Sequence, residues 1–309
     1  MKKALVIGAE GQDGQLLVKL LTEKGFEVWG LGRGKRPDPY YMAFDLAGDD
    51  YSPIEIFITT KKPDEIYYVA AFHHSSQESA ASAGVEFINR SVKVNQVGFM
   101  NVLEICRLVH PSAKLFYTSS SLIFSGTQQP VQNEKTLPAP RCLYSVSKCA
   151  AMSAAQYYRT AHNMFVTVGI MYNHESILRK DFFLSKKIVN ETRQLLHGER
   201  DEIVVGDLSA LTDWGYAPDY AEAMWHLLQQ NEPGEYIISS GQAHSVQNWF
   251  EVLYAHLGKN WRDYVNENKA LIKRDKPVLV GDNTRLLSTG WKPRVTFEEM
   301  VIRMYNNVL

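Results

Sequence analysis

One segment near the start of the chain limits the possible folds more than any other. Residues 4–7 form a short apolar run that ends at Gly8, as buried parallel strands do. Gly11 and Gly14 follow, and Leu16 then begins a helical pattern. Glycines at these positions let a backbone approach a pyrophosphate closely, and a helix that opens here presents free N–H groups to an anion. The segment therefore predicts a strand–turn–helix unit that binds a dinucleotide.

The first half of the chain repeats this alternation of apolar runs and helical patterns. Residues 54–60 fit a helix or a strand equally well, but the other segments are clear. We expect strands near residues 27–31, 65–69, 114–118 and 165–170, and a helix near residues 92–109. Alternation of this kind predicts an α/β fold of the Rossmann type, in which helices cover both faces of a doubly wound parallel sheet.

The alternation weakens after residue 171, where polar loops separate shorter elements. We therefore expect a dinucleotide-binding domain over residues 1–171, with a return segment near residues 213–240. Residues 172–309 are expected to form mainly a smaller C-terminal α/β substrate-binding region. Ligands of such folds bind beyond the carboxyl ends of the strands, where the two parts meet.

Composition excludes several classes of partner. The 309 residues carry a net charge of −1, which gives no general attraction to nucleic acid or to an anionic membrane. No run approaches the roughly 20 apolar residues that span a bilayer. The three cysteines, Cys106, Cys142 and Cys149, lack metal-ligand spacing, so we predict no metal site and a reducing, cytoplasmic environment.

The end of the second expected strand bears on the choice of cofactor. Residues 31–36 read LGRGKR, with three cations and no acid. Enzymes that use NAD usually place a carboxylate here for the ribose 2′-hydroxyl, whereas Arg33 can pair with a 2′-phosphate. We therefore expect NADP(H) to be preferred, with NAD(H) possible and a solvated basic loop as the alternative. Other expected cofactor contacts are Gln12 and Asp13, Asp45 and Leu46 near the adenine, and Ala70 and Ala71.

A second constellation follows later in the chain. Tyr144 and Lys148 are four residues apart, so they share one face of a helix. A nearby lysine is expected to lower the pKa of the phenol, which can then act as an acid or base. Ser121 ends a run of three serines after an expected strand, where its hydroxyl can bind the reacting oxygen. We predict Tyr144, Lys148 and Ser121 as catalytic residues.

These features together resemble an extended short-chain dehydrogenase/reductase, and within that superfamily the GDP-mannose 4,6-dehydratases and their 4-keto-reductase relatives. The matching stretches are residues 8–14, Ala70 and Ala71 with His74, and residues 140–148, 173–176 (NHES), 212–225 and 280–293. The resemblance implies that Tyr144 is the general base, that Lys148 also holds the nicotinamide ribose, and that Asn95 supports the cofactor. It also implies a nucleotide-diphosphate sugar as substrate, and a homodimer or homotetramer that pairs through the helix of Tyr144. Candidate substrate-binding residues are His74, Ser121, Asn173, Glu175, Arg179, Lys187 and Arg274.

Departures from the family pattern bear on the reaction. The dehydratases carry a glutamate two residues after the catalytic Ser/Thr, where this chain has Ile123, which cannot accept a proton. Thr212 also replaces an arginine. We therefore expect hydride transfer at sugar C4, by a 4-keto reductase, 4-dehydrogenase or 4-epimerase. The alternatives are a 4,6-dehydratase with a relocated base, for which Glu175, His73 and His74 are candidates, and a non-catalytic protein that senses the redox state of a dinucleotide.

Overall fold

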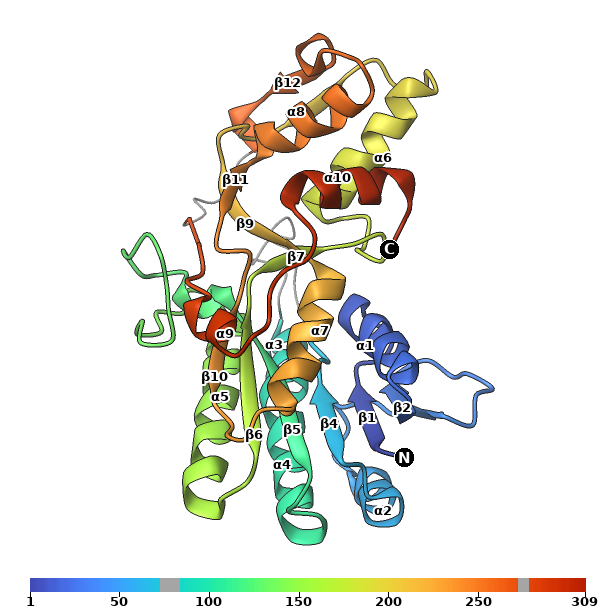
Figure 1. Ribbon diagram of the computed structural model, residues 1–309, viewed down its shortest axis with the longest axis vertical. Coiled ribbons are helices and arrows are strands. Elements are labelled where there is room, and N and C mark those ends of the chain that lie inside the picture. The colour runs from blue at the N-terminus through green and yellow to red at the C-terminus, as the bar shows by residue number, and fades with distance from the viewer. Residues whose placement is uncertain (73–83, 272–277) are drawn as a thin grey trace.

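The computed structural model describes residues 1–72, 84–271 and 278–309 of the chain (Figure 1). Its centre is a seven-stranded sheet in the order β10-β6-β5-β4-β1-β2-β3, and every neighbouring pair is parallel. The strands are β1 (Lys3–Ile7), β2 (Glu27–Gly32), β3 (Tyr41–Ala43), β4 (Glu65–Tyr68), β5 (Lys114–Ser120), β6 (Val166–Met171) and β10 (Glu235–Ile238). The expected Rossmann-type parallel sheet is confirmed.

Helices cover both faces of this sheet because side chains alternate along each strand. Ala4 and Val6 of β1 face an apolar cluster with α1 and α7, whereas Leu5 and Ile7 face a second cluster with the helices of the other side. The helices are α1 (Gln12–Glu23) and α7 (Ala217–Leu228) on the first face, and α2 (Ser52–Lys61), α3 (Val85–Val92), α4 (Gly98–Val109) and α5 (Leu143–His162) on the second. The ambiguous segment around residues 54–60 is thus helical. A π-helical turn, η2 (Lys93–Val97), joins α3 to α4.

The rest of the chain forms a smaller body at one end of the sheet (Figure 1, top). A third apolar cluster around Trp249 holds it together. Its strands are β7 (Asn173–Glu175), β9 (Leu211–Tyr216) and β11 (Ala243–Ser245) in one sheet, and β8 (Ile203–Val205) and β12 (Val265–Glu267) in another. Its helices are α6 (Leu184–Leu196), α8 (Val246–His256), α10 (Phe297–Asn306) and the short η4 (Trp261–Asp263) and η5 (Lys269–Leu271).

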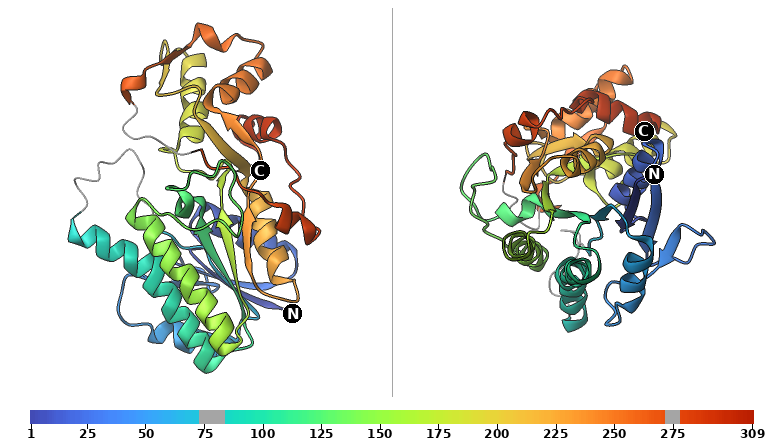
Figure 2. Two further views of the ribbon diagram at one scale, coloured as in Figure 1. Left: turned by 90° about the vertical axis from the view of Figure 1, so that its left-hand side faces the viewer. Right: turned by 60° about the horizontal axis from the view of Figure 1, so that its bottom comes forward.

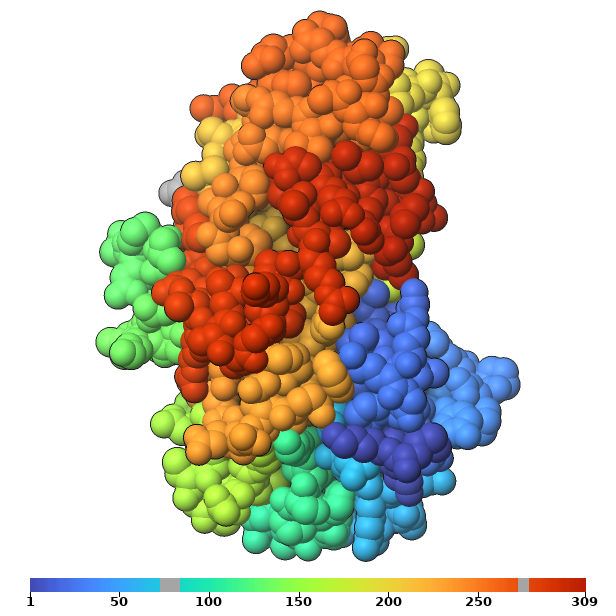
Figure 3. Space-filling model, viewed as in Figure 1, coloured from blue at the N-terminus to red at the C-terminus, as the bar shows by residue number. Residues whose placement is uncertain are grey.

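The chain crosses between the two bodies more than once. The segment of α7 and β10 returns to the large sheet, and α9 (Thr284–Ser288) packs against β10. The chain then crosses back, so the C-terminal segment extends over both bodies in Figure 3. On the face of the large sheet opposite to α1 and α7, the helices α4 and α5 run side by side (Figure 2, left). None of the described helices is long and apolar enough to cross a membrane.

Candidate active site

The glycine loop lies at the carboxyl end of β1 and is closely packed. Gly8 has a φ of +99°, and a Cβ there would lie 2.5 Å from the backbone nitrogen of Ala70. A Cβ on Gly14 would lie 2.2 Å from the carbonyl oxygen of Gly8. Glycine is therefore required at both positions, while Gly11 has more room. Since α1 begins at Gln12, its first-turn N–H groups face this loop, and the segment fits the pyrophosphate of a dinucleotide.

Two side chains of the loop tie it to the smaller body. Gln12 donates from Nε2 to the carbonyl oxygen of His174 (3.1 Å) and accepts from the Ser176 hydroxyl (2.9 Å). The His174 imidazole contacts Asp13 Oδ1 through Nε2 (2.9 Å) and the Tyr172 carbonyl oxygen through Nδ1 (2.7 Å). Both of these partners only accept hydrogen bonds when Asp13 is ionised, so both ring nitrogens donate and His174 is an imidazolium.

The electrostatics of this pair agree with that assignment. Burial by itself would lower the pKa of His174, but Asp13 raises it above its usual value, against the opposing charge of Arg179. Burial would likewise raise the pKa of Asp13, but His174 holds it below its usual value. The His174 ring also stacks on Tyr220, with ring centroids 4.7 Å apart. In the NHES segment, therefore, His174 and Ser176 hold the glycine loop, a role that the sequence reading missed.

Lys148 of α5 is fully buried and donates from Nζ to the Thr118 carbonyl oxygen at 2.7 Å. Burial lowers its pKa to about 7. Burial also raises the pKa of the Tyr144 phenol, although a hydrogen bond with the Ser120 side chain acts in the opposite direction. The expectation that Lys148 lowers the pKa of Tyr144 is wrong for this structure, because the phenol is desolvated and the buried amine loses much of its own charge at neutral pH.

The serine run turns at the carboxyl end of β5. Ser120, the last residue of the strand, is the hydroxyl that hydrogen-bonds Tyr144. Ser121 begins the short helix η3 (Ser121–Phe124) and is buried, as is Ile123, which is wholly enclosed by the apolar cluster of α4 and α5. The sequence predicted a hydroxyl at this turn, and the structure shows that of Ser120 in a hydrogen bond with the phenol; the catalytic role of Ser121 stays a prediction.

The expected substrate residues separate into three groups. Glu175 is buried, accepts a hydrogen bond from Ser185 (2.6 Å) and forms an ion pair with Arg179 (3.1 Å). Asn173 is exposed, and Lys187 lies on α6 with its ammonium 3.8 Å from Glu191. His73, His74 and Arg274 lie outside the described residues. Arg179 is the member of this set whose charge acts on Tyr144, since it lowers the pKa of the phenol.

The remaining expected cofactor residues follow the carboxyl edge of the sheet. Asn95 is fully buried in η2 and braces the segment after β4: its amide donates to the Phe72 carbonyl oxygen (2.9 Å) and accepts from the Phe72 N–H (2.8 Å). Ala70 and Leu46 are buried in the apolar cluster between the sheet and the helices α4 and α5. Asp45 forms a 2.9 Å ion pair with Arg90. Ala71 is exposed.

A carboxylate from another loop contacts the end of β2, where residues 31–36 have no acid of their own. Glu10, from the glycine loop, accepts hydrogen bonds from the backbone N–H groups of Arg33 (3.1 Å) and Gly34 (3.2 Å). The Arg36 guanidinium lies 3.7 Å from the same carboxylate. Residues 31–36 carry no acid of their own, but the fold brings the Glu10 carboxylate against them, so the expectation of NADP(H) loses part of its basis.

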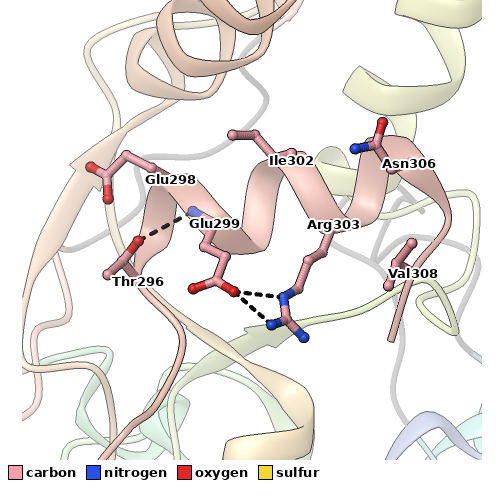
Figure 4. Close-up of a pocket in the computed structure, with 7 residues that line it drawn as sticks. All are labelled: Thr296, Glu298, Glu299, Ile302, Arg303, Asn306 and Val308. Carbon is pink, nitrogen blue, oxygen red and sulfur yellow. Dashed lines mark hydrogen bonds and ion pairs between the residues drawn. The ribbon is translucent and has the colours of Figure 1, made fainter.

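Hollows elsewhere on the surface do not coincide with these residues. The one drawn in Figure 4 runs along α10, where Glu299 and Arg303 pair across one helical turn. A second is lined by residues of the 133–135 loop, α5 and α9. Neither includes Tyr144, Lys148 or the glycine loop. Among the described residues, no group of His, Cys, Asp and Glu is arranged to hold a metal ion.

Comparison with known proteins places this geometry in a family. A family model described as GDP-mannose 4,6 dehydratase matches residues 5–304. The chain belongs to the GDP-mannose 4,6-dehydratase family. GDP-mannose 4,6 dehydratase 1 of Arabidopsis thaliana is 33% identical over 100% of this chain and 90% of its own length.

Solved structures share the fold at lower identity. RMD from Pseudomonas aeruginosa, complexed with NADPH, superposes with a TM-score of 0.81 at 20% identity, covering 99% of this chain and 98% of that one. UDP-glucose 4-epimerase of Thermus thermophilus, in complex with NAD, gives a TM-score of 0.81 at 23% identity with the same coverage of both chains. These two structures show the fold of the chain, while the family model and the curated relatives show a nucleotide-sugar-modifying enzyme.

Proposed function

We propose that this enzyme transfers hydride at a ring carbon of a GDP-sugar, with C4 as the expected position, as a 4-keto reductase, 4-dehydrogenase or 4-epimerase. The observation that carries the proposal is the joint placement of Tyr144, Ser120 and Lys148 at the end of β5, on the edge of the sheet that also carries the glycine loop. The family supports a GDP-sugar as substrate.

The protein's own groups account for the proton transfer. The raised pKa of Tyr144 keeps its phenol protonated at neutral pH, so it can donate a proton to a ketone oxygen as hydride reaches the carbon. In the opposite direction the phenolate accepts the hydroxyl proton. The Ser120 hydroxyl hydrogen-bonds the phenol oxygen, and Lys148 donates a hydrogen bond to the Thr118 carbonyl oxygen, which fixes the position of its ammonium.

The groups that would hold the cofactor fit a nicotinamide dinucleotide, which supplies or accepts the hydride when bound. Gly8, Gly14 and the start of α1 fit its pyrophosphate, and Lys148 is in place for the nicotinamide ribose. For the adenosine end, Arg33 favours NADP(H), whereas Glu10, which contacts the same loop, favours NAD(H).

A second candidate is full 4,6-dehydration, and the comparisons favour it, since the family and the relatives most similar in sequence are GDP-mannose 4,6-dehydratases. Elimination of water also needs a base for the sugar C5 proton. Ile123 is apolar and enclosed, and Glu175 is already engaged by Arg179 and Ser185. The described residues thus favour hydride transfer without elimination.

Incubation of the whole protein with GDP-mannose and either oxidised cofactor separates the two. Chromatography with mass spectrometry is expected to show a keto sugar that retains its full complement of oxygen, or an epimer of unchanged mass that elutes apart from GDP-mannose. Formation of a 4-keto-6-deoxy sugar would establish the dehydratase instead. Tyr144→Phe should abolish turnover and leave cofactor binding nearly intact. Tyr157→Phe, an exposed tyrosine on the same helix, is the matched control. Unchanged turnover in Tyr144→Phe would remove the catalytic assignment.

We also propose that the enzyme pairs through α4 and α5. These neighbouring helices expose large apolar side chains, Met100 (38%) and Leu108 (61%) on α4 and Val146 (50%) on α5. Light scattering coupled to gel filtration should give a dimer or tetramer, and Leu108→Glu should shift it toward the monomer.

A further inference from the structure

The side chain of Glu10 crosses from the glycine loop to the loop after β2. Its carboxylate accepts the N–H groups of Arg33 and Gly34, and Arg36 lies 3.7 Å away. Two glycines provide the room: a Cβ on Gly34 would lie 2.1 Å from Glu10 Oε1, and one on Gly32 would lie 2.8 Å from Oε2. The carboxylate therefore sits in a fitted position, with the Glu10 side chain 33% exposed.

This position is where Rossmann folds recognise the adenosine ribose. A carboxylate at the end of the second strand accepts hydrogen bonds from ribose hydroxyls, and enzymes that bind a 2′-phosphate provide N–H groups and arginines instead. Here the N–H groups that a phosphate would use are already bound to Glu10. Arg36 faces Glu10, and the charge of Arg33 acts on Asp45, so both arginines of the basic loop have a carboxylate nearby.

The charge of Glu10 is stable at neutral pH. Burial would raise its pKa, but the N–H groups of Gly34 and Arg33, together with Arg36, hold the pKa below its usual value. A 2′-phosphate placed at these N–H groups would meet an ionised carboxylate at contact distance, which disfavours it electrostatically.

We propose that Glu10 selects the cofactor: from the glycine loop it supplies the ribose-binding carboxylate that the end of β2 lacks, so the enzyme prefers NAD(H) over NADP(H). The proposal rests on the dinucleotide site of the proposed function. The proposal reverses the preference for NADP(H) that the basic residues 33–36 indicated, because Glu10, more than 20 positions earlier in the chain, occupies the backbone N–H groups of that loop.

Direct binding tests this without reference to turnover. Calorimetric titration of the whole protein should give a lower Kd for NADH than for NADPH, by roughly tenfold or more, the value of one charge-assisted hydrogen bond. Glu10→Gln keeps the shape and removes the charge, so it should weaken NADH binding and strengthen NADPH binding. Glu10→Asp retains the charge at a shorter reach and should keep the preference for NADH.

The control is Glu23→Gln, an exposed glutamate at the far end of α1, which should leave both affinities unchanged. Tighter binding of NADPH than of NADH by the unmodified protein would overturn the proposal, as would a ratio that Glu10→Gln does not alter. Failure to bind either nucleotide would instead remove the dinucleotide site on which the proposed function itself depends.

Discussion

The Asp13–His174 pair allows a quantitative test of how the glycine loop is held. Asp13→Asn retains the shape of the side chain and one acceptor for His174 Nε2, but it removes the negative charge. A hydrogen bond between charged groups contributes about 1.5–3 kcal/mol and a neutral one about 0.5–1.5 kcal/mol, so we expect a loss of about 1–2 kcal/mol of unfolding free energy. Water should screen this pair only weakly, because the side chains of His174 and Asp13 are 10% and 22% exposed.

The dependence on pH follows from the directions of the two pKa shifts. The pKa of His174 is raised in the folded protein, so its contribution is complete below the unfolded pKa of about 6.5 and is lost as pH rises through the folded value. The pKa of Asp13 is lowered, so its contribution is lost only as pH falls through that lower value. The deficit of Asp13→Asn should therefore be largest in mildly acidic solution and should shrink at alkaline pH.

Urea unfolding followed by tryptophan fluorescence, repeated from about pH 5 to about pH 9, measures this difference. Asp201→Asn is the matched control, because Asp201 is an exposed loop aspartate and its replacement should cost little at any pH. A deficit that is equally large at both ends of the range would show that His174 is not an imidazolium. No deficit at any pH would show that the pair does not hold the loop.

Three further predictions concern single positions. In the unmodified protein, stability should rise with pH between about 7 and about 10, because the buried Lys148 amine binds its proton less tightly in the folded state than in the unfolded state. Lys148→Met should remove this rise. Parallel curves of stability against pH for the two proteins would contradict the prediction. Gly14→Ala should lower the free energy of unfolding by at least about 2 kcal/mol and abolish NADH binding, since the added Cβ meets the Gly8 carbonyl oxygen. Gly84→Ala, with open space around the added Cβ, should be nearly neutral in the same unfolding and binding experiments. Ile123→Glu should lose several kcal/mol of unfolding free energy in urea rather than create a dehydratase, because the carboxylate would be buried in an apolar cluster. The control, Ile123→Val, should lose about 1 kcal/mol. A stable Ile123→Glu variant that dehydrates GDP-mannose would refute this account of the burial of Ile123.

Much of the fold was readable from local pattern. The apolar runs, their alternation with helical patterns and the glycine spacing depend on near neighbours, and they predicted the parallel sheet and the strand–turn–helix unit that the structure contains. The spacing of Tyr144 and Lys148 likewise places both on α5. Residues 54–60 were ambiguous because a short apolar run fits either element, and packing on the sheet decided for a helix.

The chemistry of the site depended on contacts that no local pattern carries. Glu10 reaches the loop after β2, and Asp13 meets His174 from 161 residues away, only because the fold brings the ends of separate strands together. The pKa of Tyr144 rises because the surrounding chain removes water from the phenol, and that desolvation is a property of packing. The sequence by itself therefore determined the scaffold and the types of residue at its edge. The tertiary structure decided which of them touch and which charges they carry, because both depend on groups distant in the chain.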